Sequence, residues 1–544
     1  MIYIVIFLHQ TSSAINDSAG GGVMQGKKVF RPRLFYNLSL ESMVAADDFY
    51  RKVSEAVDFR FLYKATAHYY GIEGNESIDP VVFFKICMVG YLNNISSDRR
   101  LVRFCNDSLS VRLFLGYDLD EQLPWHSTIS RTRQLYGEEV FLLLFKQVLQ
   151  LCIEKGMVSG RRQAMDSAFI KANASMDALL EKEVLDDVEK YAGELADNSE
   201  PTVTAEKKKE IEQRQFSQEK RRQERAGSDS RAGKHLSNAT HYSPTDPDAR
   251  ISTKPGKPRN LNFSGQVSVD TAQHVITGAC TDFADKRDSQ CLEKLCGQAI
   301  ENLRGNEIEI DEVLADTAYS SGEAMSYLQE NKLNYWIPNH GQFRAEHKGF
   351  IYNKELDQYE CQRGNRAILP FKKAYSDKEG YTLHRYRSSE SVCKNCEHKS
   401  ECCGEKSKYK KIERSEHYDL YIENHQKRQQ NKRYAKRMSR LRSSTVEPVL
   451  GTLLNFTAMK RLNVRGIAGA EKHILMAALC YNLKKMLRFK PKKKAAAALT
   501  RISKPGTLGK TLRWAFFFLL RAVWDCMAPP VITGRNRQRN ISFA

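Results

Sequence analysis

The chain has 544 residues, enough for two or three domains with a large hydrophobic core, which excludes a disulfide-held miniprotein and a short interaction module. It has 85 Lys and Arg against 65 Asp and Glu, a formal net charge of +20. This basic excess favours a polyanionic partner, nucleic acid first and a membrane surface second. The 13 cysteines do not fall into paired, evenly spaced sets, and no cleavable secretory leader precedes them. They therefore predict reduced thiols in the cytoplasm.

Two apolar stretches near the chain ends do not fit membrane spans. Residues 1–23 open with MIYIVIFLHQ, which lacks a positive n-region and is too short to cross a bilayer. We expect a disordered leader there, or a start codon assigned upstream of a true start at Met24. In the basic C-terminal tail, 491–544, Arg521 interrupts WAFFFLLRAVW, which favours a buried or interfacial helix. We expect no membrane partner.

Apolar residues recur at helical spacing from about residue 47 to residue 151, as in VVFFKICMVGYL and VFLLLFKQVLQLCI. This pattern predicts a helical N-terminal domain over 24–160. Within it, HSTISRTRQLYG combines a Ser/Thr start with Arg131 and Arg133, which suits the recognition helix of a helix-turn-helix that binds DNA. An ordinary surface helix fits the same residues equally well.

The next region alternates extended and helical patterns. RRQAMDSAFIKANAS is an extended segment that carries Asp166 among apolar and small residues. Residues 181–234 are charged and poor in aromatics, which predicts a solvated helical or coiled-coil insertion. A hairpin is expected around residues 271–273, then a helix in SQCLEKLCGQAIENL. EIDEVLADTAYSSGEAMSYLQENKLNYWIPN predicts strand, turn, helix and strand, with Asp316 at the end of its first strand.

The polar segment 341–413 is rich in cysteine and poor in aliphatic residues. Its cysteines include one C-x2-C pair, a third thiol separated from that pair by five residues, an adjacent fourth and an upstream fifth. Four thiolates at such spacing suit a tetrahedral structural zinc ion, and the alternative is a set of reduced thiols in a loop. The candidate ligands are Cys361, Cys393, Cys396 and Cys402, with Cys403 as a substitute for Cys402.

A strongly basic run, HQKRQQNKRYAKRMSRLRSS, leads into TVEPVLGTLLNFTAMKRLNVRG. Glu447 is the acid beside the apolar face of the second segment, and we expect it to start a helix there. Such a run is usually a solvated helix face. Its position next to a candidate catalytic carboxylate favours a role in steering a phosphate backbone towards that carboxylate.

Asp166, Asp316 and Glu447 stand in settings that differ from those of the other acids. Taken singly, each would more often be a helix cap or a surface carboxylate. Three carboxylates that converge can hold two divalent cations about 3.5 to 4 Å apart, the arrangement that activates a hydroxyl and stabilises a leaving oxygen in phosphoryl transfer. Hard oxygen ligands favour magnesium.

At these residues the sequence resembles the bacterial insertion-sequence transposases of the DDE class. The blocks that carry the resemblance follow the family's order and are DSAFIKANAS, SPTDPDARISTKPGK, LADTAYSS and RSSTVEPVLGTLLNF. Together with the helical start they cover about residues 24–488. The resemblance implies an α/β ribonuclease-H-like catalytic core over 161–490, with Asp166, Asp316 and Glu447 as its three acids and Mg²⁺ or Mn²⁺ as its metal. Because the acids lie far apart, the core must carry insertions, at about 181–234 and 341–413.

The resemblance also implies DNA contacts. Arg442, five residues before Glu447, is the candidate for the family's phosphate-binding arginine. The family's lysine position, seven residues after that glutamate, is Leu454 here. Further basic residues in or near the matching blocks are expected to contact DNA. These are Lys254, Lys257, Lys460 and Arg461.

The implied function is that of a DNA transposase. It would bind the terminal inverted repeats of its element, cut the 3′ ends with a divalent metal and join them to target DNA, in the bacterial cytoplasm at the nucleoid. Holding two ends requires a homodimer or a larger synaptic complex. Two alternatives remain, a DNA-binding regulator with structural acids and a metal-dependent nuclease without strand transfer.

Overall fold

The computed structural model describes residues 39–71, 77–182, 236–252, 259–340, 347–376, 381–404 and 406–490. The predicted leader, almost all of the charged insertion and the C-terminal tail lie outside these ranges. Within them, no helix is both long and apolar enough to cross a membrane.

The first part of the described chain is helical, as the apolar periodicity predicts. One of its longer helices, α4, begins after Asp79, whose carboxylate accepts hydrogen bonds from the backbone N–H groups of Val81 and Val82. Pro80 occupies the first helical position, where no N–H is needed. The elements are α1 (Leu40–Met43), α2 (Phe49–Ala56), α3 (Phe61–Thr66), η1 (Ala67–Tyr69), α4 (Pro80–Leu92), α5 (Asp98–Asp107), α6 (Leu109–Leu115), α7 (His126–Leu135) and α8 (Glu138–Glu154).

A six-stranded sheet follows, and β1 lies near its middle. β5 runs antiparallel to β1 on one side, and β4 and β6 pair with β5. β7 runs parallel to β1 on the other side, and β8 runs parallel to β7. The predicted hairpin is confirmed as β5 and β6. The strands are β1 (Arg162–Lys171), β4 (Arg250–Ser252), β5 (Asn260–Asp270), β6 (Ile276–Phe283), β7 (Glu312–Leu314) and β8 (Asn334–Trp336).

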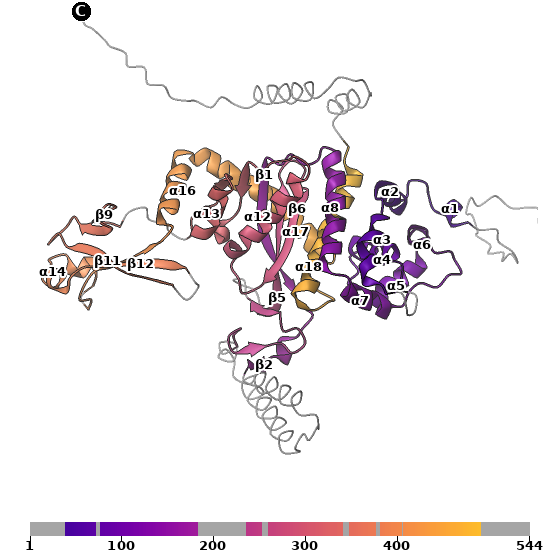
Figure 1. Cartoon of the computed structure of the whole chain (residues 1–544), viewed down its shortest axis with the longest axis horizontal. Helices are drawn as coiled ribbons and strands as arrows, with labels where there is room; N and C mark the ends of the chain where they lie inside the picture. Colours follow the sequence, from indigo (N-terminus) through magenta and orange to yellow (C-terminus); the bar gives the residue numbers. More distant parts are fainter. Residues whose placement is uncertain are drawn as a thin grey trace, which may run out of the picture.

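Helices cover both faces of this sheet (Figure 1). Met165 and Val313 face a cluster built on α12 (Asp288–Arg304) and α13 (Gly322–Glu330). The predicted strand, turn, helix and strand around Asp316 are confirmed as β7, η3 (Thr317–Tyr319), α13 and β8. Leu314 lies on the opposite face, against Ala435 and Met438 of α17 (Lys432–Phe456). α16 (Tyr418–Gln430) precedes α17, and the short elements η2 (Met176–Ala178), β2 (Leu180–Glu181) and β3 (His241–Tyr242) flank the charged insertion.

The last described helix, α18 (Gly466–Arg488), joins the N-terminal helices to the sheet. It contacts α4 and α8 on one side and β6 on the other. The Asn482 side chain fixes it to the sheet, because it accepts a hydrogen bond from the backbone N–H of Ile276 at 2.9 Å and donates one to the Ile276 carbonyl at 2.8 Å. One continuous hydrophobic core therefore runs from the N-terminal helices into the sheet.

A second sheet, which we call the distal sheet, projects from the main body (Figure 1). It is antiparallel, its five strands follow the order β13-β12-β11-β10-β9, and two short helices accompany it. It lies in the segment predicted to be the cysteine-rich insertion, 341–413, except that its last strand ends two residues later, at Ser415. Its elements are β9 (Phe350–Asn353), β10 (Gln358–Cys361), β11 (Ile368–Ser376), β12 (Thr382–Arg387), α14 (Glu390–Lys394), α15 (Lys399–Cys402) and β13 (Lys411–Ser415).

The prediction that Glu447 starts a helix is wrong. The first residues of the basic run end α16, but the run from Lys432 onward and the segment around Glu447 form one uninterrupted helix, α17, even though Pro448 lies inside it. The reason is that buried positions continue at helical spacing through the whole segment, so tertiary packing outweighs the hydrogen bond that Pro448 cannot donate. These buried positions are Ala435, Met438, Thr445, Val446, Val449, Leu450 and Leu453.

Candidate active site

Asp166 and Asp316 lie on neighbouring parallel strands. β1 and β7 pair Arg162 with Glu312 and Ala164 with Leu314. Extending this register by two residues sets Asp166 beside Asp316, just past the carboxyl end of β7. Because side chains alternate along a strand, both acids lie on the sheet face that α17 covers. Asp316 is half-buried and accepts a hydrogen bond from the Ala318 N–H at 2.9 Å.

Helix α17 brings the third predicted acid to the same place through Arg442. Arg442 Nη1 lies 2.8 Å from Asp166 Oδ2, and Arg442 Nη2 lies 3.5 Å from Glu447 Oε1. The Glu447 side chain is 60% exposed, whereas that of Asp166 is 17% exposed. Arg442 therefore links Asp166, at the base of the site, to Glu447 at the solvent edge, and Asp316 lies beside Asp166.

The electrostatics of Asp166 differ from those of an ordinary surface acid. Burial raises the pKa of this carboxyl, and the neighbouring charge of Asp316 adds to the rise. The Ser167 N–H, which donates to Asp166 at 2.8 Å, and the Arg442 guanidinium oppose the shift, but the net pKa is above its usual value. The fold thus disfavours a lone negative charge here and favours added positive charge.

A fourth acid, on the same face of the sheet, was not predicted. Glu312, at the start of β7, forms an ion pair with Arg162 and accepts hydrogen bonds from Tyr434 at 3.1 Å and from Trp336 at 3.3 Å. Asn334 also donates to it, at 3.0 Å. Burial acts to raise the pKa of Glu312, but the Arg162 contact and the other donors outweigh it, so the pKa is lowered. Glu312 is therefore a structural carboxylate, and its only sequence signal was an acid inside an apolar strand.

The two arginines of α7 have different surroundings. Arg131 is exposed. Arg133 is buried, and its guanidinium forms two 2.9 Å hydrogen bonds with the two carboxylate oxygens of Asp98 on α5. The prediction that Arg133 contacts DNA is not compatible with this burial. Its side chain instead links α7 to α5, which helical spacing alone could not reveal.

The remaining predicted DNA contacts fall into two groups. Lys460 and Arg461 are exposed in the segment after α17, whose backbone runs beside the end of β1, with the Lys171 N–H donating to the Lys460 carbonyl at 3.1 Å. Lys254 and Lys257 lie outside the described residues.

The basic run forms a continuous exposed face on α17, which we call the basic face. Its members recur at helical spacing, and the same line of exposed positions continues through Ser444 to Glu447. None of them forms an ion pair with another residue that the structure describes. They are Lys432, Arg433, Lys436, Arg437 and Arg440.

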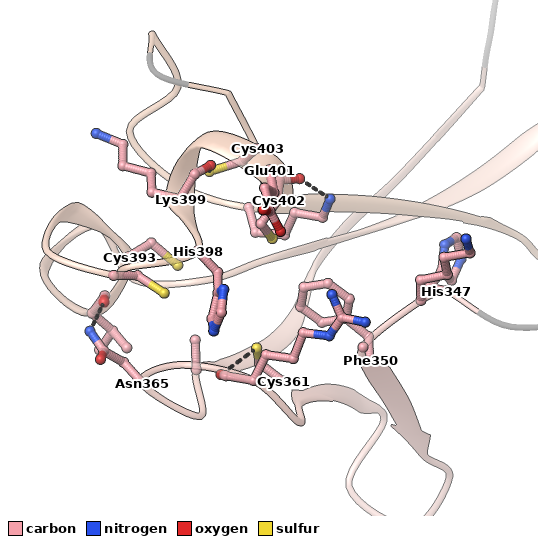
Figure 2. Close-up of a pocket in the computed structure, with 17 residues that line it drawn as sticks. His347, Phe350, Cys361, Asn365, Cys393, His398, Lys399, Glu401, Cys402 and Cys403 are labelled. Atoms are coloured by element: carbon pink, nitrogen blue, oxygen red, sulfur yellow. Dashed lines mark hydrogen bonds between the residues drawn. The ribbon is translucent and has the colours of Figure 1, made fainter.

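The predicted cysteine ligands line one cavity of about 370 Å³ in the distal sheet. Figure 2 shows Cys361, Cys393 and Cys402 around it, together with the His398 ring. As placed, no three His, Cys, Asp or Glu side chains in the described ranges form a ready coordination group. The thiols of the cysteine cavity and the three acids are alike in this respect.

Two transposase families match parts of the chain. Residues 38–135 match a family described as a transposase domain (DUF772), and residues 360–487 match a transposase DDE domain. The second match includes Arg442 and Glu447, whereas Asp166 and Asp316 precede it. No curated protein matches the chain.

Among solved structures, the chain is similar to a piggyBac transposase synaptic complex with hairpin DNA, at 11% identity and a TM-score of 0.28. This likeness covers 90% of this chain and 85% of that chain, but at such a TM-score it supports no argument. The family matches carry the assignment. Both matched domains are transposase domains and follow one another along a single chain, which supports an insertion-sequence transposase of the DDE type.

Proposed function

We propose that this transposase cuts the 3′ ends of its element and joins them to target DNA, with Asp166, Asp316 and Glu447 as the catalytic carboxylates. One observation carries the proposal. The β1–β7 register sets Asp166 beside Asp316, and Arg442 links Asp166 to Glu447. Three acids separated by 150 and 131 residues in the sequence are thus connected through Asp166, which lies beside Asp316 and is linked to Glu447 by Arg442.

The sheet supports a ribonuclease-H-like core. Its strands follow the order β6-β5-β1-β7-β8, the first three antiparallel and the last three parallel. The first acid lies on the central strand and the second just past the adjacent parallel strand. In open α/β sheets, sites form at such carboxyl ends where the connections diverge. A regulator with purely structural acids has no need of this arrangement.

The donor set fits magnesium or manganese. All three groups are carboxylates, which are the hard oxygen donors that these ions prefer, and the raised pKa of Asp166 indicates a site that favours added positive charge. When bound, such ions activate the attacking water or 3′-hydroxyl and stabilise the leaving oxygen. Asp166 and Asp316 would hold them from the sheet, and Glu447 from the exposed side of α17.

Arg442 has a positioning role in this proposal. In the absence of DNA its guanidinium neutralises Asp166 and Glu447, which prevents the two carboxylates from repelling each other. An arginine fork also binds phosphate oxygens well, so the same side chain can turn from the acids to the DNA backbone. This agrees with the phosphate-binding role that the family resemblance implies.

The basic face of α17 provides a path for DNA to the acids. Its five exposed lysines and arginines lead along one helix towards Glu447. Phosphate contacts supply most of the salt-dependent affinity for duplex DNA. We propose that this face, with Lys460 and Arg461, binds the DNA backbone, and that two copies of the chain bring two element ends together.

Acid-to-amide variants test the catalytic assignment. Asp166→Asn, Asp316→Asn and Glu447→Gln should each reduce Mg²⁺-dependent cleavage of end DNA by more than about 100-fold, because a metal ligand is lost, while DNA binding persists. Asp311→Asn is the matched control, since Asp311 is an exposed acid just before β7 and should leave cleavage unchanged. Full cleavage by all three acid variants would favour the regulator. Cleavage without joining of the ends to a target plasmid would favour the nuclease.

End recognition is assigned to the N-terminal helical segment, residues 24–160, with Arg131 of α7 as a contact. Because this segment shares the hydrophobic core of the sheet, deleting it would expose apolar surface, so point variants are the better test. Arg131→Ala should lower the preference for end DNA over random DNA, with unchanged unfolding. If the variant and the wild type preferred end DNA over random DNA equally, Arg131 would not be a contact for the element end.

A further inference from the structure

We propose that the cysteine cavity of the distal sheet binds one structural Zn²⁺ ion through Cys361, Cys393, Cys396 and Cys402. This site is distinct from the three acids and goes beyond the proposed catalysis. Four cysteine thiolates form a closed tetrahedral zinc site, which leaves no open position for a reacting water. The ion would stabilise the fold of the distal sheet.

The four thiols come from three segments that meet at the cavity. Cys361 is the last residue of β10, Cys393 belongs to α14, and Cys402 is the last residue of α15. Cys396 follows α14, and its N–H donates to the Cys393 carbonyl at 3.4 Å, which closes the C-x2-C turn. All four line the same space. A spacing of two residues between the first pair is typical of structural zinc sites.

Backbone geometry holds the Cys361 segment against the C-x2-C turn. Gly364, in the turn after β10, has a positive φ of 52°, and a Cβ at this position would lie 2.5 Å from Cys396 Sγ. Only glycine permits so close an approach in this conformation. The next residue, Asn365, donates a hydrogen bond from its side chain to the Val392 carbonyl at 2.9 Å. Two segments about 30 residues apart in sequence are thus clamped together beside the thiols.

The distal sheet has little apolar material to hold it. Its hydrophobic cluster contains only five buried residues, for five strands and two helices. Small units with so few buried side chains usually need a disulfide or a metal. The structure pairs none of the described cysteines in a disulfide. A metal ion bound by the cysteines is therefore the remaining cross-link that could hold the distal sheet together. The five buried residues are Tyr359, Ala367, Leu369, Tyr386 and Ile412.

Ligation requires side-chain rotation and a balanced charge. Cys361 Sγ now lies 3.0 Å from the Arg363 carbonyl, and Cys393 Sγ lies 3.0 Å from Ser388 Oγ, so both thiols must turn towards the cavity. Each thiol releases its proton to solvent on binding. Four thiolates and one Zn²⁺ carry a charge of −2, which the basic residues in the cavity wall offset. These residues are Lys348, Arg363, Lys399 and Lys410, against one acid in the wall, Glu401.

Metal analysis of the full chain tests the proposal. Protein expressed with added zinc and purified without chelator should contain about one zinc per chain, and Cys393→Ser should contain less than about one-tenth as much. Cys296→Ala is the matched control, because Cys296 is buried in α12 far from the cavity in sequence, and should retain its zinc. Protein without zinc, or equal loss in both variants, would overturn the site.

A second measurement on the wild-type chain avoids dependence on a variant that fails to fold. With zinc bound, alkylation should spare Cys361, Cys393, Cys396 and Cys402, and a strong chelator should expose all four. Co²⁺ in place of zinc should give the intense visible bands of tetrahedral thiolate coordination. The site would be excluded if the chelator did not change the alkylation of the four cysteines, or if bound Co²⁺ gave an octahedral spectrum. Cleavage of end DNA is assayed separately, so failure here leaves the catalytic proposal untouched.

Discussion

The same pair of strands carries two charged clusters that differ in one respect. At the start of β1 and β7, Glu312 is paired with Arg162 and accepts hydrogen bonds from three further side chains. Four residues further on, Asp166 and Asp316 lie side by side, and Arg442 is the cation in contact with Asp166. Both clusters lie under α17. In the Glu312 cluster, each carboxylate oxygen accepts a hydrogen bond. In the Asp166 cluster, the carboxylates carry more negative charge than Arg442 can neutralise.

This difference separates a structural carboxylate from a catalytic one. The pKa of Glu312 is lowered because Arg162 and the other donors outweigh its burial, whereas the pKa of Asp166 is raised because burial and Asp316 outweigh Arg442. A fold that raises the pKa of an acid gives up stability at that position. Such a cost is expected where the acid serves binding or catalysis.

The largest effect that we expect is a loss of folding stability when the Glu312–Arg162 cluster is disrupted. Glu312→Ala leaves the half-buried Arg162 without its ion-pair partner, and the cost of breaking a fully buried pair, about 3–5 kcal/mol, is the upper limit here because Arg162 keeps its hydrogen bond to Tyr434. Urea unfolding measures the free-energy change. Asp311→Ala is the control, because the neighbouring Asp311 is 66% exposed and lies 4.0 Å from Arg161. The control should stay within about 0.5 kcal/mol of wild type. A loss in the control as large as in Glu312→Ala would show that position on β7, and not pairing, sets the cost.

A smaller effect is expected at the other cluster. Asp166→Asn should change the free energy of unfolding by no more than about 1 kcal/mol, because the fold already disfavours the charge that the substitution removes and Arg442 keeps Glu447 as an ion-pair partner. The same variant should lose DNA cleavage. Thermal and urea unfolding of this variant and of Glu312→Ala, measured side by side, give the comparison. A loss of several kcal/mol in Asp166→Asn would make Asp166 a structural acid like Glu312.

Much of this sheet could be predicted from the sequence. The alternation around residues 271–273 predicted the hairpin of β5 and β6, and the strand that ends before Asp316 was also predicted. The register that places Asp166 beside Asp316 could not be predicted, because strand pairing over 150 residues leaves no local signal. The family resemblance, and not spacing, supplied the grouping of the three acids.

The errors have physical causes of the same kind. Arg133 and Arg131 are equivalent in sequence, but Asp98 of another helix buries one of them. Glu447 lies inside α17 because the apolar positions of that helix continue past Pro448. Glu312 was missed because its partners, Arg162, Trp336 and Tyr434, are spread over three segments. In each case a tertiary partner, which no local pattern encodes, decides the role of the residue.

The smallest effect that we expect is a pH dependence of the stability that Glu312 contributes, and it sharpens the comparison between the two clusters. The pKa of Glu312 is lowered by folding, so its ionised form stabilises the protein above the ordinary value of 4.5, and that stability is lost as pH falls through the folded pKa. Glu312→Gln cannot titrate. The variant should therefore be less stable than wild type near neutral pH, and this gap should narrow as the pH falls below 4.5, because protonated Glu312 then resembles glutamine. Urea unfolding at a series of pH values measures the gap, and Asp311→Asn should show no comparable narrowing. A gap that stays constant or widens in acid would mean that Glu312 is not ionised in the folded protein, and the contrast between the two clusters would then rest on Asp166 alone.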